Sequence, residues 1–167
     1  MAHVQCAKII CGSKFKVYDY LTSPANLAEQ LAGHIDVKWQ NPGVELAPES
    51  EFLFLMTRFG IEQPIRFVVD RMVHGNSLTY RQVSGVYARF VHTMKFEEHG
   101  QNETLVTDFL EYEIPFGLIG RLADDFFIRS DLIKLLEARL EVARLKFDKE
   151  NLTSTTGAAK NNGSAAV

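Results

Sequence analysis

Apolar and polar residues alternate along much of this chain, which is the period of a half-buried β-strand. Turn residues such as Asn41-Pro42-Gly43 and His74-Gly75-Asn76 separate the alternating segments. The pattern predicts strands at residues 3–12, 35–41, 51–58, 61–73, 77–83, 87–97 and 103–113. All but the first follow one another through short turns, which indicates an antiparallel meander. Pro64 favours an edge position or a bulge near the start of its strand.

A helical period replaces the alternation elsewhere. Ser13 fits the N-cap of a short helix through Leu21. Ser23-Pro24 begins a second short helix, and Gly33 ends it. Residues 118–150 predict one helix about 48 Å long. Its apolar stripe consists of Leu122, Phe126, Ile133, Leu136, Leu140, Ala143 and Phe147. The first half is apolar almost all round, so it must be buried on several sides or cover a cavity.

This order of elements predicts an α+β fold. We expect a seven-stranded, curved antiparallel sheet wrapped around the long C-terminal helix, with two short helices after the first strand. A chain of 167 residues is long enough for one domain, which we assign to residues 1–150. Residues 151–167 have no large apolar residue after Leu152, which predicts a disordered tail. A single helix cannot fill the concave face of such a sheet, so a cavity that binds apolar ligands is expected.

Composition agrees with a globular protein and excludes several classes. The chain is 46% hydrophobic, and its net charge of −3 disfavours nucleic acid as a partner. Cys6 and Cys11 fall about 16 Å apart on opposite faces of the predicted strand, too far for a disulfide. Unpaired thiols suit a reducing compartment. There is neither a signal-peptide pattern nor an apolar run of about 18 residues, so we expect a cytoplasmic protein without integral membrane association.

Familiar catalytic and metal-binding motifs are absent from the sequence. It contains no Cys/His cluster with zinc spacing, no Gly-x-Ser-x-Gly elbow, no P-loop and no dinucleotide fingerprint. We therefore expect neither a metal nor a cofactor. The basic residues of the long helix alternate with Glu137 and Glu141, which predicts a solvated face and not a phosphate track. These basic residues are Lys134, Arg139, Arg144 and Lys146.

One segment resembles a known family. A Thr-x-Val-x-Asp strand runs into a Tyr-x-x-Pro-x-Gly step and then into the long helix, at Thr104, Val106, Asp108, Tyr112, Pro115 and Gly117. This segment resembles the polyketide cyclase/dehydrase and lipid-transport branch of the SRPBCC superfamily. From residue 3 to about residue 149, the order of elements is similar to the superfamily's helix-grip fold, which START lipid-transfer domains and the birch-pollen allergens share. The resemblance implies a site for lipids, sterols, polyketides or aromatic metabolites, with cyclisation, dehydration or hydrolysis in some members.

Alternate residues of the strands should point into the cavity. The candidate ligand-binding residues are Ile65, Phe67, Val69, Tyr80, Phe90, His92, Met94, Val106, Leu110 and Tyr112 from the sheet, with Phe126 and Ile133 from the helix. Tyr80 and Tyr112 could orient a polar group of the ligand. The alternative is that these side chains form an ordinary packed core.

His92 and Asp108 form the candidate catalytic pair. His92 lies between Phe90 and Met94 on the expected inner face, where it could bind a ligand or transfer a proton. The alternative is a buried histidine satisfied by a neighbouring group. Asp108 shares its face with apolar residues, and a dry carboxyl would have a raised pKa. A register slip of one residue would instead make it a rim carboxylate in a surface ion pair.

Three functions are compatible with these features. The first is binding, with or without transport, of a small hydrophobic or aromatic molecule such as a lipid or a polyketide-like metabolite. The second is a polyketide aromatase/cyclase or dehydratase that uses His92 and Asp108 as its acid–base pair. The third is an interaction protein with a large exposed apolar patch. A cavity below about 100 Å³ would contradict the first, because ligand sites usually occupy about 300 Å³ or more. Whether the chain forms a homodimer is left open.

Overall fold

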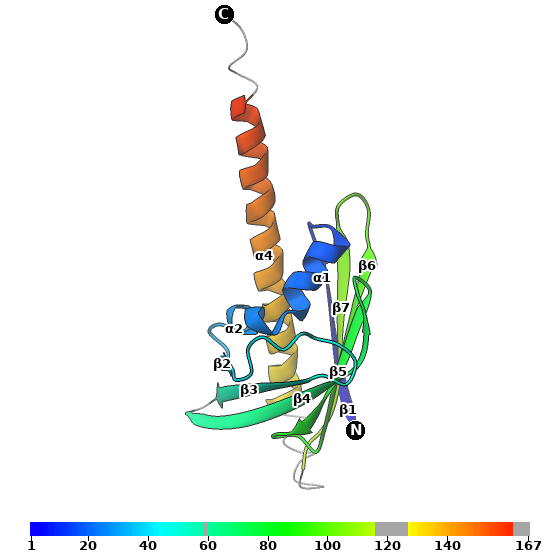
Figure 1. The fold of residues 1–167 in the computed structure, drawn as a ribbon, viewed down its shortest axis with the longest axis vertical. Helices are drawn as coiled ribbons and strands as arrows, with labels where there is room; N and C mark the ends of the chain where they lie inside the picture. Colours follow the sequence, from blue (N-terminus) through cyan, green and yellow to red (C-terminus); the bar gives the residue numbers. More distant parts are fainter. Residues whose placement is uncertain (59, 116–126, 162–167) are drawn as a thin grey trace, which may run out of the picture.

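The computed structural model describes residues 1–58, 60–115 and 127–161, and within them seven strands form one antiparallel sheet (Figure 1). The strands are β1 Ala2–Ile10, β2 Asp36–Trp39, β3 Glu51–Arg58, β4 Ile61–Val73, β5 Ser77–Ser84, β6 Arg89–Glu98 and β7 Thr104–Glu113. Their order across the sheet is β1-β7-β6-β5-β4-β3-β2. Together with the long helix α4 (Arg129–Asn161), the sheet confirms the predicted helix-grip α+β architecture.

Short helices connect the two edges of this sheet. β1 pairs with β7, and the chain then passes through α1 (Lys14–Thr22), the 3₁₀ helix η1 (Pro24–Asn26) and α2 (Leu27–Gln30) before it enters β2. Pro24 takes the first position of η1, where its missing N–H has no cost. Both α1 and α2 pack against α4, and α1 also contacts β6. The short helices therefore close one end of the space between sheet and helix (Figure 1).

The pairing of β4 with β5 is irregular at two places. The register shifts between Arg66 and Phe67 and again between Val69 and Arg71. Such bulges bend a strand and increase its twist. At Pro64, β4 pairs only with β3, because β5 ends opposite Arg66. This agrees with the edge position that Pro64 favours, since proline has no N–H for a second neighbour.

Helix α4 lies across the concave face and continues beyond the sheet to Asn161 (Figure 1). The predicted end near Glu150 is therefore wrong; no proline follows that residue, and nothing else in the sequence stops the helix there. The predicted start near Leu118 falls in residues 116–126, outside the described residues, as does Phe126. The assignment of residues 1–150 to one domain and 151–167 to a tail stays a prediction.

One part of the core lies where α4 meets α1. Leu140, Ala143 and Phe147 of α4 are buried there against α1 and the inner face of the sheet. Cys6 and Cys11 are both free thiols, in agreement with their predicted separation. Within the described residues, no helix is both long and apolar enough to cross a membrane.

Gly12, between β1 and α1, provides a test of this packing. A Cβ atom at Gly12 would lie 2.7 Å from Cδ1 of Phe147 and 3.1 Å from Cγ2 of Val17. We expect Gly12→Ala to lower the free energy of unfolding by about 1–3 kcal/mol, the usual cost of overpacking a core. Urea denaturation measures this change. Ser13→Ala, at a neighbour whose side chain makes no capping hydrogen bond, is the control, and equal stability of the two variants would contradict the expectation.

Candidate ligand-binding cavity

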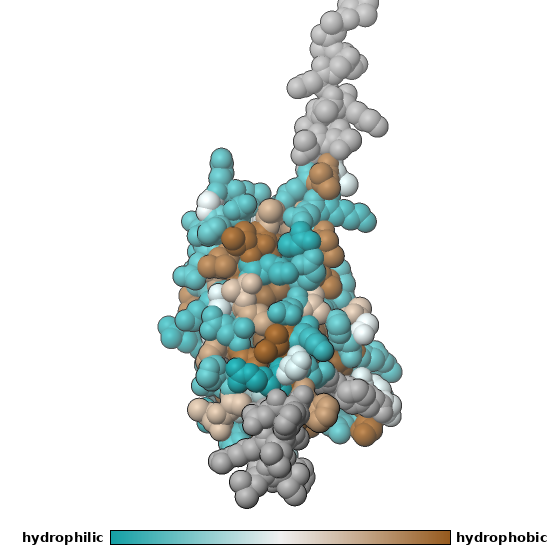
Figure 2. Space-filling model, turned by 180° about the vertical axis from the view of Figure 1, so that it is seen from behind, coloured by the Kyte–Doolittle hydropathy of each residue, from teal (hydrophilic) through white to brown (hydrophobic). Residues whose placement is uncertain are grey.

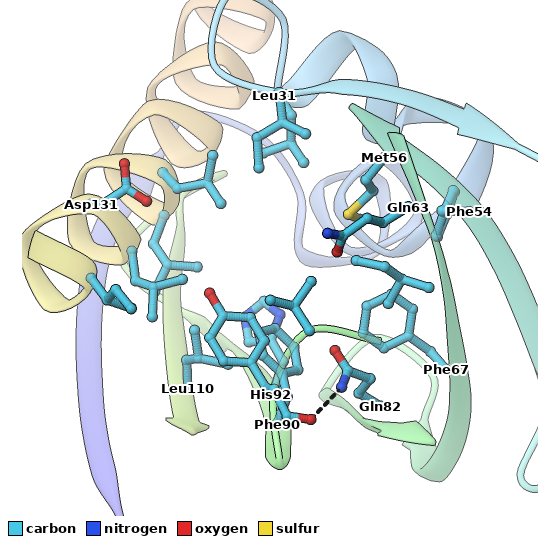
Figure 3. Close-up of a pocket in the computed structure, with 18 of the residues that line it drawn as sticks. Leu31, Phe54, Met56, Gln63, Phe67, Gln82, Phe90, His92, Leu110 and Asp131 are labelled. Carbon is cyan, nitrogen blue, oxygen red and sulfur yellow. Dashed lines mark hydrogen bonds between the residues drawn. The ribbon is translucent and has the colours of Figure 1, made fainter. Parts of the chain in front are cut away.

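A cavity of about 740 Å³ lies between the sheet and the first turns of α4 (Figure 3). Its walls come from α2, from β3 to β7 and from α4, and most of the lining side chains are apolar. The volume exceeds the roughly 300 Å³ at which ligand sites begin. The sheet and helix are therefore packed together at the α1 end and separated by a cavity at the other end. This agrees with the expectation that a single helix cannot fill the concave face.

Half of the predicted ligand-binding residues line this cavity. They are Ile65, Phe67, Tyr80, Phe90, His92 and Leu110. Others are buried in the packed core and do not line the cavity; these are Val69, Met94, Val106 and Tyr112. Ile133 is partly buried beside the cluster that contains Tyr112 and is not among the lining residues. Phe126 lies outside the described residues.

Several lining residues were not among the predicted ones. α2 contributes Leu27, Leu31 follows it, and β3 contributes Phe52, Phe54 and Met56. The signal for β3 was present in the sequence, because these three residues occupy alternate positions of its apolar run. Two amides, Gln63 and Gln82, also line the cavity (Figure 3). The Gln82 amide donates a hydrogen bond to the backbone oxygen of Tyr87 at 2.8 Å.

A chain of polar side chains runs from the cavity into the core. Tyr80 Oη lies 2.7 Å from His92 Nδ1, and His92 Nε2 lies 3.4 Å from Asp108 Oδ1. Arg139 Nη1 donates to Asp108 Oδ2 at 3.2 Å. The sheet register produces this row, because Tyr80 is paired with His92 across β5 and β6, and Met94 of β6 with Asp108 of β7. The predicted pairing of His92 with Asp108 is therefore formed.

Arg139 is buried, which corrects its predicted place on a solvated helix face. It is only 4% exposed. Its Nε donates to Gln30 Oε1 at 2.7 Å, and its Nη2 donates to the backbone oxygen of Leu21 at 2.6 Å. Alternation of charges along the helix suggested solvent, but position 139 follows Leu136 by three residues and so lies on the apolar stripe. The helical period was the better guide to its position.

The carboxyl group of Asp108 is fully buried yet charged. Burial alone raises its pKa, but the charge of the Arg139 guanidinium, helped by the N–H of His92, outweighs that effect and holds the pKa below its usual value. Both alternatives for Asp108, a raised pKa and a surface ion pair, are therefore wrong, because neither included a buried arginine. Burial raises the pKa of Tyr80 to about 12, so its hydroxyl keeps its proton at neutral pH. Asp108 itself does not line the cavity and lies behind His92.

This arrangement suits Asp108 for orienting His92 and not for donating a proton to a ligand. A carboxylate held by an arginine is a poor general acid at neutral pH. Within the residues the structure describes, no group of three or more His, Cys, Asp or Glu side chains gathers to hold a metal ion. Most of the cavity wall is apolar. The polar side chains that line it are Gln63, Tyr80, Gln82, Tyr87, His92, Ser130, Asp131, Lys134 and Arg139.

Solved structures similar to this chain share its fold. The protein TTHA0849 from Thermus thermophilus superimposes with a TM-score of 0.72 at 14% identity, covering 89% of this chain and 99% of that one. The ginseng major latex-like protein 151 from Panax ginseng gives 0.65 at 13%, covering 87% and 97%. The di-domain ARO/CYC StfQ from the steffimycin biosynthetic pathway gives 0.66 at 15%, covering 89% of this chain and 52% of that one.

Identities this low show the fold alone. That fold is the helix-grip fold expected from the order of elements. No family model matches the sequence, and no curated protein matches it.

The buried ion pair predicts how stability depends on pH. The folded-state pKa of Asp108 lies below its unfolded value of about 3.9. Its contribution is therefore complete above that value and is lost as the pH falls through the folded-state pKa. We expect Asp108→Asn to cost about 3–5 kcal/mol of unfolding free energy at pH 7, because Arg139 is left without its counter-charge. The difference from the wild type should shrink below about pH 4.

Urea denaturation at pH 7, 5 and 3 measures this dependence. Asp70→Asn is the matched control, because Asp70 pairs with Arg81 at 2.8 Å on the surface. We expect that variant to change stability by less than about 1 kcal/mol. Equal losses for the two variants would contradict the assignment of a special role to the buried pair.

Proposed function

We propose that this protein binds, and carries, one small hydrophobic or aromatic molecule in the cavity between the sheet and α4. The observation that carries the proposal is the cavity itself, about 740 Å³ in volume and lined mainly by apolar side chains. A native core of ordinary packing density contains few voids larger than a water molecule. A lined space of this size is typical of a ligand site.

Apolar burial would supply most of the affinity. A ligand that loses about 200 Å² of apolar surface to the cavity gains roughly 5 kcal/mol at about 25 cal/mol per Å². Aromatic side chains from three strands, Phe52, Phe67 and Phe90, offer flat surfaces for a ring or an acyl chain. Few polar groups face this space, so they would fix the orientation of the ligand more than its affinity.

The ligand would enter between exposed apolar side chains. Ile61, Val86 and Phe127 line the cavity and are also 60%, 47% and 76% exposed, respectively. They come from the start of β4, from the turn after β5 and from the residues before α4. A small molecule that meets them can pass into the cavity without first crossing a polar surface.

Binding is favoured over the two other functions considered. The acid–base mechanism requires both His92 and Asp108 to reach a substrate, but Asp108 lies behind His92 as an ion-paired carboxylate. The fold neighbour StfQ is an ARO/CYC protein, so the fold alone does not decide the question. An interaction protein should show a wide apolar patch. On the face seen in Figure 2, hydrophilic side chains border the apolar ones.

The remaining expectations belong to the same proposal. Cys6 and Cys11 are free thiols, which supports a reducing compartment such as the cytoplasm. The partner would be the small hydrophobic molecule, and the net charge of −3 gives no support to nucleic acid.

Filling the cavity tests the proposal directly. Gln63 points into the cavity from β4, so Gln63→Trp should occupy ligand space (Figure 3). With the neutral fluorescent probe 1-aminoanthracene, we expect saturable binding to the wild type and at least about tenfold weaker binding to Gln63→Trp, because a ring now competes for the same volume. Fluorescence titration measures both.

The neighbouring residue provides the control. Glu62 is exposed and is not among the lining residues, so Glu62→Trp adds the same side chain on the other face of β4. It should bind the probe as the wild type does. Equal loss in both variants, or no saturable binding to the wild type, would contradict the proposal. Native mass spectrometry of the purified protein, followed by extraction, would identify the chemical class of any molecule that co-purifies.

A further inference from the structure

The direction of each hydrogen bond around His92 determines what Tyr80 can offer to a ligand. We propose that the cavity selects ligands that donate a hydrogen bond, through a hydroxyl or an N–H group, over ligands that can only accept one. The acceptor in the protein is Tyr80 Oη. This inference rests on the proposed function, because it concerns the ligand of the same cavity.

The argument begins with the charges in the core. Asp108 is 0% and Arg139 4% exposed, and their opposite charges cancel. His92 is 3% exposed in the same cluster. A neutral imidazole keeps the cluster neutral, whereas an imidazolium would add a buried positive charge without a counter-charge. We therefore take His92 as neutral, with a proton on one ring nitrogen only.

The carboxylate determines which nitrogen carries that proton. Arg139 already occupies Oδ2 of Asp108, which leaves Oδ1 facing His92 Nε2 at 3.4 Å. Within the described residues, neither of these two buried atoms has a hydrogen-bond partner of standard geometry, and each faces the other across this contact. An ionised carboxylate can only accept, so Nε2 must carry the hydrogen for the contact to be favourable. Nδ1 is then left with a lone pair.

Tyr80 donates its one hydroxyl hydrogen to this lone pair. Its Oη lies 2.7 Å from Nδ1, and a neutral imidazole without a hydrogen on Nδ1 can only accept there. The phenol keeps its proton at neutral pH and donates it to His92. A phenol has a single hydrogen, so its oxygen has only lone pairs left for any other neighbour.

The consequence concerns the ligand, because Tyr80 and His92 both line the cavity. A hydroxyl or N–H placed at Tyr80 Oη completes the row of hydrogen bonds. A carbonyl, an ether or a carboxylate there would bring two acceptors together with no hydrogen between them. Buried polar groups that lack a partner carry the full cost of their lost hydration. Gln63 offers both donors and an acceptor, so it does not discriminate in this way.

A pair of matched compounds tests this selection. 2-Naphthol can donate a hydrogen bond, and 2-methoxynaphthalene has the same rings and an oxygen that only accepts. By isothermal titration calorimetry, we expect 2-naphthol to bind the wild type about tenfold more tightly, the range of one buried hydrogen bond. Tyr80→Phe should weaken 2-naphthol to the level of 2-methoxynaphthalene. Tyr18→Phe, which removes a buried hydroxyl outside the cavity, should leave the ratio unchanged.

Asp108→Asn tests the direction of the hydrogen bonds, provided that circular dichroism shows it folded. Arg139 can only donate, so the amide oxygen must face it and the amide nitrogen must face His92 Nε2. The proton of His92 then moves to Nδ1 and points at Tyr80, which frees the phenol hydrogen for a ligand. The ratio of affinities should fall towards one because 2-methoxynaphthalene binds more tightly.

The outcomes separate the two proposals. If neither the two compounds nor 1-aminoanthracene binds the wild type, the proposed function fails and this inference with it. If 1-aminoanthracene binds but neither compound binds or displaces it, the selection alone is wrong. If both bind the wild type equally, or 2-methoxynaphthalene binds more tightly, the cavity binds ligands but the selection is wrong. A ratio that persists in Tyr80→Phe would overturn the assignment to Tyr80 Oη.

Discussion

Arg139 and Asp108 carry opposite charges inside the protein, and almost none of either side chain is exposed. Through this one arginine, α4 is tied to the sheet at Asp108, to α1 at the Leu21 carbonyl and to α2 at Gln30. A buried guanidinium is stable only when its donors are matched, so the contact fixes how the helix lies on the sheet. Arg139 also lines the cavity, so α4 is fixed to the sheet beside the space in which a ligand would lie.

The ion pair also orders the polar groups of the cavity. Asp108 stays charged because of Arg139, and it is the charged carboxylate that orients the imidazole of His92. Tyr80 in turn is oriented by His92. Arg139 of α4 therefore determines, through Asp108 and His92, how the Tyr80 hydroxyl on β5 can form hydrogen bonds. Structural support and ligand recognition depend on the same group.

Local pattern was enough to predict the sheet, but not the site in full. Period-two alternation placed Asp108 on the inner face, since only one register buries Val106 and Leu110 together. The same pattern could not separate cavity from core, because Val69 and Phe67 look alike in sequence although only Phe67 lines the cavity. Arg139 was wrongly predicted on the solvated face, because we followed the alternation of charges and not the helical spacing from Leu136. The far end of α4 was misplaced because no residue signals where contacts with the body cease.

The pairing of β1 with β7 affects the order in which the chain can fold. Ala2 lies opposite Tyr112, so β1 cannot pair in the sheet until β7 has been synthesised. The chain emerges from the ribosome with α4 behind every strand, and the apolar concave face has no cover until that helix has been synthesised. Non-local pairings of this kind slow folding, because the loop must close before the contacts form. During synthesis, an apolar ligand or a chaperone could therefore bind the concave face before α4 covers it.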